Sequence, residues 1–508
     1  MLPKHSIFRN ALLLTAIDLL LRGISMSFQI YLSGVIGAAG LGLLQLVAAV
    51  GTLGMTLGLS GVRTAAMYLC AEEYGKRRPG GMRHVMRLCI LWSSVFSILT
   101  AAALWGFSNQ LAAVWLKDLR AASGLRILAL SLPVECLVCV LCGYFTACGK
   151  LRKLACVEVA ERLVSLALTF LLLRLWAHSE LERACCSLLL GGGGAAVFSA
   201  VWLGLLMRKD FRQYPPVPPP PQLPRRLCRL CVPLALGDYL RSGLRTLEQL
   251  LIPLGLERSG GSTGSAMAAY GTIHAMVFPI LMFPAAIIFS LSELLIPELA
   301  RCRAEGNSRR ILHLTGRSLR LGLVFACGIA ALQFLLARPL GMLFYQSEEA
   351  GHYLRLFAPL IVILYADALV DGMCKGLGQQ AANVRNNTIT SLLDVALLYL
   401  LLPRWGIGGY FFTFVLTHVL NFYLSLRLLL DASGSALPLG PLAKTALCAL
   451  ASAAACLLLP ERGQCLLQIL RTCGLFLAAY LPLLYLTGAL VPNDRRWLRR
   501  TLSRGKGH

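Results

Sequence analysis

The feature that most constrains the fold of this chain is a series of about 14 apolar stretches, each near 20 residues long, separated by short segments. A stretch of that length crosses the hydrocarbon core of a bilayer as a helix, which satisfies its own backbone polar groups. The hydrophobic content of 57% agrees with this interpretation and excludes an ordinary soluble enzyme. We therefore expect an all-α polytopic membrane protein. The expected spans are 8–33, 40–64, 88–108, 125–148, 155–176, 184–206, 231–254, 267–296, 318–337, 354–374, 386–403, 407–429, 441–459 and 465–490.

The basic residues are distributed unequally between the two sides of this series. The chain has 48 Lys and Arg residues against 24 Asp and Glu residues. Segments on one side carry roughly three times as many basic residues as those on the other, which predicts that both termini are cytoplasmic. Because the excess lies in short loops between apolar spans, it indicates membrane topology in a cell membrane, and no nucleic-acid partner is expected.

An internal repeat and a proline-rich segment predict the domain organisation. Residues 125–174 match residues 354–403 at a constant shift of 229, without a gap. The matched pairs include Leu125 with Leu354, Arg126 with Arg355, Gly143 with Gly372 and Gly149 with Gly378. We expect two six-helix lobes inserted in the same sense, an arrangement suited to alternating access. The predicted domains are an N-terminal lobe 1–214, a cytoplasmic proline-rich linker 215–224, a C-terminal lobe 225–430, and 431–508 with two extra helices and a basic cytoplasmic tail. The linker is interpreted as a spacer, with a ligand for a proline-binding partner as the alternative.

One apolar span carries four charges on a single helix face. Asp238, Arg241, Arg245 and Glu248 are spaced three, four and three residues apart, within an arc of about 80°. Ionisable groups in hydrocarbon are costly and normally face a protein interior or a water-filled cavity. The sequence therefore predicts the wall of a polar cavity. The alternative is a structural cluster in which Asp238 pairs with Arg241 and Arg245 with Glu248.

The first two spans also contain charged residues. Asp18 and Arg22 form an i,i+4 pair in the first span, which the repeat makes the counterpart of the seventh. Arg63 lies near the expected cytoplasmic end of the second span, where snorkelling to the interface is as good an interpretation as a cavity role. Pro279, Pro284 and Pro297 predict kinks in or beside the eighth span.

The second half has its own acidic face. Asp367, Asp371 and Lys375 follow one another at intervals of four residues in the tenth span, and Asp394 lies in the eleventh, one turn after Thr390. Carboxylates with nearby hydroxyl groups are suited to holding a proton or Na⁺. An ion pair between Asp371 and Lys375 is an equally good interpretation.

The 18 cysteines do not predict a metal site or a disulfide framework, since most fall inside expected spans. Cys136, Cys139 and Cys142 occur mid-span at helical spacing, which favours packing between helices. No Walker loop, nucleophile elbow or His-rich cluster is found in the sequence, so an enzyme is not expected.

Several segments together resemble a known family, the polysaccharide-transporter-like relatives of stage V sporulation protein B in the multidrug/oligosaccharidyl-lipid/polysaccharide exporter superfamily. The resemblance covers nearly the whole chain. It implies two six-helix lobes in a V around a central cavity, followed by two additional helices, and it implies flipping of a polyprenyl-diphosphate-linked sugar between leaflets. The segments are GAAGLGLLQL (37–46), LSGVRTAAMYLCAEE (59–73), 269–300, APLIVILYADALVDGMCKGLGQQ (358–380) and 401–429.

The resemblance also implies site residues. In the related lipid II flippases, arginines on the first, second and eighth helices contact the diphosphate. Arg22 matches the first of these and Arg63 the second. The eighth span here has no arginine, and Arg241 and Arg245 on the seventh are the nearest candidates. The Na⁺ residues of those flippases correspond to Glu248, Asp394 and either Thr413 or Thr417.

We therefore expect a flippase for a peptidoglycan or spore-envelope precursor, driven by the membrane potential or by coupled Na⁺ or H⁺, with no other cofactor. Arg22, Arg241 and Arg245 are expected to contact the diphosphate, with Asp18 and Glu248 positioning them. Asp367, Asp371 and Asp394 are the ion-coupling candidates. Besides the substrate and membrane lipids, envelope-synthesis enzymes are the expected partners.

Three rival functions remain open. A multidrug/cation antiporter of the same superfamily is expected to have a cavity dominated by acidic residues. A membrane-embedded glycosyltransferase needs a catalytic carboxylate beside a large outer loop, whereas the loops here are short. The third is a non-transporting scaffold for envelope synthesis.

Overall fold

The computed structural model describes residues 4–76, 79–176, 181–215, 217–219, 222–434, 439–458 and 465–489. All regular structure in these ranges is helical. Nine helices in the described part are long and apolar enough to cross a membrane, judged by length and composition. Each expected span lies on helical backbone wherever it is described, whereas a total of fourteen crossings stays a prediction.

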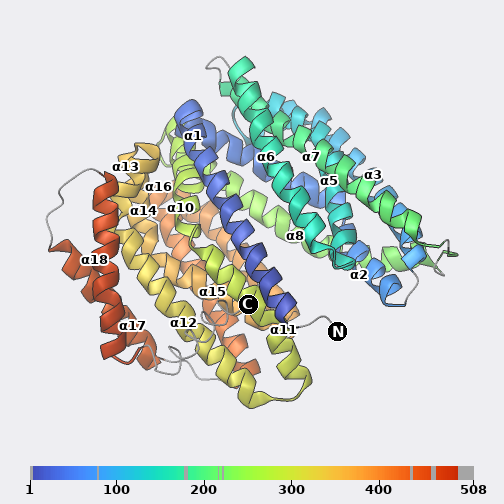
Figure 1. The fold of residues 1–508 in the computed structure, drawn as a ribbon. Coiled ribbons are helices and arrows are strands. Elements are labelled where there is room, and N and C mark those ends of the chain that lie inside the picture. The colour runs from blue at the N-terminus through green and yellow to red at the C-terminus, as the bar shows by residue number, and fades with distance from the viewer. Residues whose placement is uncertain are drawn as a thin grey trace. The chain divides into compact units, whose positions relative to one another are not determined.

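The chain forms two compact units (Figure 1), which we call unit 1 and unit 2. Unit 1 contains Met1–Ile30, Thr272–Asp394 and Phe411–His508, and unit 2 contains Tyr31–Gly271 and Val395–Tyr410. The predicted division at the proline-rich segment stays a prediction.

The helices of unit 2 follow the second half of α1 (Lys4–Leu59), which begins in unit 1. They are α2 (Val62–Gly75), η1 (Pro79–Gly81), α3 (Met82–Gly106), α4 (Ser108–Gln110), η2 (Leu111–Trp115), α5 (Ala121–Ala147), α6 (Leu151–Trp176), α7 (Leu181–Gln213), α8 (Leu223–Arg258) and α9 (Thr263–Gly271).

Unit 1 contains most of the remaining helices. They are η3 (Thr272–Val277), α10 (Phe278–Met282), α11 (Ala285–Ala304), α12 (Ser308–Leu335), α13 (Ala337–Tyr345), α14 (Glu348–Phe357), η4 (Ala358–Leu360), α15 (Ile361–Gly376), α16 (Gln380–Ser433), α17 (Leu439–Leu457) and α18 (Cys465–Leu486).

Two glycines divide the longest helices. Within α1, Gly37 has φ 69° and ψ 179°, and within α16, Gly406 has φ 53° and ψ −133°. Both conformations have positive φ and are strained for residues with a Cβ. Each glycine lies between two expected spans, 8–33 and 40–64 in α1, and 386–403 and 407–429 in α16.

Prolines interrupt the expected eighth span. A π-helical turn, η3, ends just before Pro279, and the break between α10 and α11 falls at Pro284. Proline removes one backbone donor and crowds the preceding turn, which explains both irregularities. Pro297 lies inside α11 without interrupting it.

The repeat extends beyond the segment visible in the sequence. A shift of 229 residues carries the end of α3 at Gly106 onto the end of α12, and the end of α5 onto the end of α15. It also carries the start of α6 onto the start of α16, and the end of α6 at Trp176 onto Trp405, directly before the bend in α16. The two copies therefore share helix boundaries over residues 82–176 and 311–405.

Unusual backbone conformations repeat in the same register. Lys117 and Gln346 have φ 52° and 50°, a left-handed conformation that is uncommon for residues other than glycine. Gly149 and Gly378 have φ 67° and 69°. Because the same strained positions recur 229 residues apart, the two copies have the same local backbone fold.

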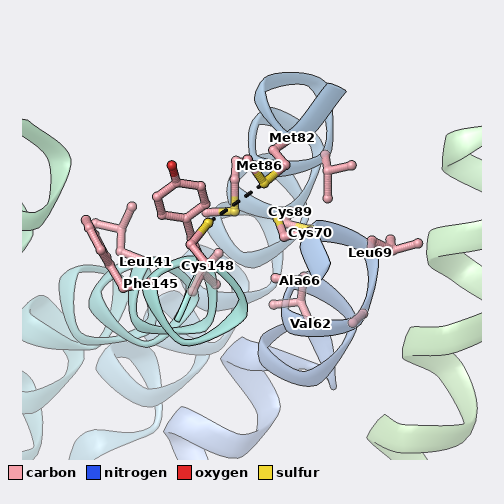
Figure 2. Packing of buried hydrophobic residues seen from close by; sticks show 14 of the residues in the cluster. Val62, Ala66, Leu69, Cys70, Met82, Met86, Cys89, Leu141, Phe145 and Cys148 are labelled. Atoms are coloured by element: carbon pink, nitrogen blue, oxygen red, sulfur yellow. Dashed lines mark hydrogen bonds between the residues drawn. The ribbon is translucent and has the colours of Figure 1, made fainter. Parts of the chain in front are cut away.

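The core of unit 2 is rich in sulfur (Figure 2). Cys70, Met82 and Cys89 are fully buried between α2, α3 and α5, and Cys148 Sγ lies 3.8 Å from Met82 Sδ. Cys136 is also fully buried, and the cysteines of the described part are free thiols. These positions confirm that cysteine serves here as a small packing residue. Within the described residues, no cluster of His, Cys, Asp and Glu has the arrangement of a metal site.

Ion pairs fix the ends of several unit 2 helices. The buried Asp210 of α7 accepts from Lys150 at 2.6 Å and lies 3.5 Å from Lys153. Burial alone lowers the pKa of Lys150, but the ion pair with Asp210 outweighs it and raises that pKa above its usual value. At α2, the hydrogen bond from Lys76 lowers the pKa of Glu72, and Arg226 of α8 adds to this effect.

The last two helices pack on α12 of unit 1. Phe476 and Tyr480 of α18 are buried, and the Tyr480 hydroxyl donates to the Val324 carbonyl at 2.8 Å. Cys448 of α17 joins the same cluster.

Candidate functional site

The charged face of α8 is only partly neutralised within its own helix. Arg241 donates to Asp238 at 2.9 Å, which confirms one of the two local pairs considered from the sequence. The second pair, between Arg245 and Glu248, does not form. Arg245 is exposed, and among the described residues it has no hydrogen bond or ion pair. Glu248 is half-buried and interacts elsewhere.

The direction of this face is set by the rest of α8. Leu236, Leu240 and Leu247 are exposed and lie about 160–180° around the helix from Arg241 and Arg245, at 100° per residue. The helix thus has an exposed apolar stripe suited to lipid and an exposed charged face on the opposite side. The charged face of α8 is therefore not its apolar, lipid-type surface.

The first-span arginine lies on unit 1. The guanidinium carbon of Arg22 is 5.5 Å from the ring centroid of Phe289 on α11, within cation–π range. The side chain of Asp18 lies outside the described residues, so its pairing with Arg22 stays a prediction.

Arg63 lies exposed near the start of α2 in unit 2. Its charge acts on Glu158 of α6, which is itself influenced by Glu161 and Arg162. The sequence reasoning did not select the glutamates of α6. Their three-residue spacing, 158 to 161, was a signal available in the sequence.

A polar network joins α15 to both halves of α16 within unit 1. Asp371 pairs with Lys375 at 2.6 Å and accepts from Asn383 at 2.5 Å. Asp367 accepts from Asn421 at 3.1 Å. The ion pair considered from the sequence, Asp371 with Lys375, is thus confirmed, and Asp371 is neutralised by its own helix.

Asp394 occupies a different environment from Asp371. It is 7% exposed, and its Oδ1 accepts from the Thr417 hydroxyl at 2.7 Å. Thr413, one turn before Thr417, is fully buried. Neither Asp394 nor Asp367 forms an ion pair with a basic side chain in the part of the chain that the structure describes.

Three buried oxygens of this region have no hydrogen-bond partner among the described residues. They are Asp367 Oδ1, Asn387 Oδ1 and Thr413 Oγ1. A buried, unpaired carboxylate is costly unless it is protonated or neutralised by a cation. Carboxylate, amide and hydroxyl oxygens are ligands suited to a hard cation such as Na⁺. We call Asp367, Asn387, Asp394, Thr413 and Thr417 the acidic site of unit 1.

Sequence reasoning missed the amide and hydroxyl members of this network. Asn383, Asn387, Thr390 and Asp394 follow at intervals of four, three and four residues, which places them on one face of α16. Thr417, Asn421 and Ser425 repeat every four residues on the second half of the helix. The periodicity was present, but a search for charged residues does not detect it.

Comparisons with known proteins identify the class. The MatE family model matches residues 16–171 and 263–400. Stage V sporulation protein B of Bacillus subtilis (strain 168) is 21% identical over 415 residues, which cover 80% of this chain and 80% of that protein.

Solved structures share the fold. The lipid II flippase MurJ, in an inward closed conformation, has a TM-score of 0.70 and 12% identity, with 92% of this chain and 98% of that chain covered. An inward-facing multidrug resistance MATE family transporter of the MOP superfamily has a TM-score of 0.62 and 15% identity, with 82% and 93% covered.

The fold and these matches define a multi-pass, all-helical membrane transporter of the MOP superfamily, not an enzyme. Because the family model matches more than half of the residues, the chain belongs to the MatE family. The resemblance noted from the sequence is thereby confirmed.

Proposed function

We propose that this transporter flips a polyprenyl-diphosphate-linked saccharide from the inner to the outer leaflet of the cell membrane, with both of its termini cytoplasmic. The observation that carries the proposal is the unpaired Arg245 on the charged face of α8, opposite an apolar stripe. A guanidinium in an apolar span needs an anionic partner. The described residues supply one to Arg241 but not to Arg245.

A diphosphate suits this arrangement chemically. The planar guanidinium donates two parallel hydrogen bonds to phosphate oxygens, which gives both strength and orientation. In the proposal Arg22, Arg241 and Arg245 contact the diphosphate, Asp18, Asp238 and Glu248 position them, and Arg63 contributes from α2. The substrate's polyprenyl tail stays in hydrocarbon throughout, so only its head group has to cross. A peptidoglycan or spore-envelope precursor is the proposed substrate, and envelope-synthesis enzymes are the proposed partners.

The acidic site of unit 1 is proposed to bind the coupling cation, Na⁺ or H⁺. Its buried carboxylates lack basic partners among the described residues, and its unpartnered oxygens suit a hard cation. Asp371 is proposed as a structural member, because Lys375 already neutralises it. Alternatively, the membrane potential drives flipping, at about 2.3 kcal/mol per elementary charge and 100 mV.

The rival that the structure favours most is a cation antiporter. The acidic site of unit 1 suits an organic cation as well as a coupling ion. The two functions differ in what Arg245 does, because an antiporter for cations gains nothing from an unpaired guanidinium.

The test is flipping of a fluorescent polyprenyl-diphosphate disaccharide in proteoliposomes, with and without an imposed potential. Arg245→Ala is expected to lower the rate by about 10- to 100-fold, the range for losing a charge-assisted contact. Arg258→Ala is the matched control, since Arg258 is exposed at the end of the same helix and outside the charged face. Both variants are first checked for insertion and thermal unfolding. Normal flipping by Arg245→Ala refutes the diphosphate contact. Efflux of a cationic dye without flipping establishes the antiporter instead.

A further inference from the structure

A small cavity lies where α12, α17 and α18 of unit 1 meet. Its volume is about 50 Å³, and Gln468, Arg471 and Thr472 of α18 form its polar wall. Leu335, Cys456 and Leu457 lie opposite. The three polar residues lie on one face of α18, because 468, 471 and 472 are spaced three and four residues from the first. No carboxylate lines this cavity among the described residues.

The cavity lies at the ends of the helices that form it. Leu335 is the last residue of α12, and Leu457 is the last residue of α17. Arg471 follows the start of α18 at Cys465 by six residues, about 9 Å along the helix. The ends of long apolar helices lie near the bilayer interface, where the phosphates of lipid head groups are found.

The outer surface around the cavity is apolar. Leu467 and Leu470, beside the polar wall on α18, are each 63% exposed, and Leu450 of α17 is 66% exposed. Leucines exposed at this density on a helix pair indicate contact with acyl chains. The cavity itself is small, so it admits a head-group fragment while a chain lies along the exposed leucines.

The chemistry of the polar wall selects the ligand. Arg471 provides a guanidinium fork, and Gln468 and Thr472 provide neutral donors. Such donors match the oxygens of a phosphodiester, and an arginine fork is the side chain that binds planar or tetrahedral oxyanions best. We propose that this cavity binds the phosphate group of a membrane glycerophospholipid, whose acyl chains lie along the leucines of α17 and α18. This lipid site is separate from the residues proposed to transport substrate.

The proposal is tested by counting lipids bound to the purified full chain in detergent by native mass spectrometry. The probes are dioleoylphosphatidylglycerol, dioleoylglycerol, which has the same chains without the phosphate, and inorganic phosphate. We expect phosphatidylglycerol to bind and dioleoylglycerol to bind at least about ten-fold more weakly, since it lacks the charge-assisted contact. Equal binding of the two lipids overturns the proposal, because chains alone then account for the site. Binding of inorganic phosphate as tight as that of the lipid also overturns it.

Variants locate the site. Arg471→Gln is expected to lower phosphatidylglycerol binding about ten-fold or more. Arg338→Gln is the matched control, since Arg338 is 72% exposed in α13, just beyond the end of α12, and does not line the cavity. Equal loss in both variants, or unchanged binding in Arg471→Gln, refutes the assignment. If Arg471→Gln does not fold, Thr472→Val replaces a hydroxyl by a methyl group of similar size, and a several-fold loss is expected there. Unchanged binding by a folded Thr472→Val is then the refuting result.

Discussion

Replacing Asp394 by Asn is the sharpest perturbation of the proposed ion coupling. Asn has nearly the same shape as Asp, and its Oδ1 can still accept the hydrogen bond from Thr417, which measures 2.7 Å in the native chain. The substitution therefore removes a negative charge while preserving packing around a residue that is 7% exposed. No basic side chain is left unpaired, because none forms an ion pair with Asp394 in the described part of the chain.

The size of the effect follows from the loss of that charge. Two unit charges about 4 Å apart interact with about 4 kcal/mol at an effective dielectric constant near 20. The hydroxyl oxygens of Thr413 and Thr417 remain, and the free carboxylate is itself costly to bury, so about half of this energy is expected as a net loss. A loss of about 2–4 kcal/mol corresponds to a cation affinity about 30- to 1000-fold lower.

The assay follows flipping in proteoliposomes while the Na⁺ gradient is varied at fixed pH, and then while the pH gradient is varied at fixed Na⁺. The native chain is expected to respond to one of the two gradients, and Asp394→Asn is expected to lose that response. Asp431→Asn is the control, because the same change is made at the exposed end of the same helix. If Asp394→Asn keeps the native gradient dependence, with half-maximal response at the same ion concentration, coupling through Asp394 is wrong.

Two further predictions concern stability. Gly406→Ala is expected to destabilise the protein by about 1–3 kcal/mol, because φ 53° with ψ −133° suits only glycine; thermal unfolding measures it, with Gly408→Ala, a position with open space for a Cβ, as the control. A loss no greater in Gly406→Ala than in the control contradicts the strain argument. Asp210→Asn is expected to cost about 2–3 kcal/mol, less than a fully buried pair because Lys150 is 24% exposed. Since the folded-state pKa of Lys150 is raised, this contribution is complete below about pH 10.4 and is lost as the pH rises through the raised pKa, so native and Asp210→Asn unfolding temperatures should converge only in that alkaline range.

The helices of this chain were predictable because membrane insertion imposes one rule on every span. Apolar length fixed the position of each span, and the backbone could not satisfy itself in another way. What composition could not provide was how helices join across short connections. The continuous backbone through Gly37 and Gly406 depends on single φ and ψ values, which hydrophobic length does not encode.

The side-chain pairs were only half predictable. Asp238 with Arg241 and Arg245 with Glu248 have the same three-residue spacing, yet only the first pair forms. Spacing brings two side chains within reach, but rotamers and neighbouring groups decide which contact is made. Asp371 with Lys375 shows the same limit, since its pairing removes an acid that the sequence had placed among the ion-coupling candidates.

The acidic site was located in outline from its carboxylates. Its neutral members were missed because an amide or a hydroxyl in a span costs far less than a charge and so does not stand out. Asn387 and Thr413 became candidates only through their buried, unpartnered oxygens, a property of packing and not of sequence.

The shared register of the two repeats makes this protein its own reference for engineering. Every residue from 82 to 176 has one counterpart whose backbone environment nature has already tested with a different side chain. The left-handed position held by Lys117 and Gln346 thus accepts two unrelated side chains without glycine. Val138 and Cys142 stand where α15 carries Asp367 and Asp371, so transplanting those two acids onto α5 would rewrite one half in the chemical language of the other without altering the backbone.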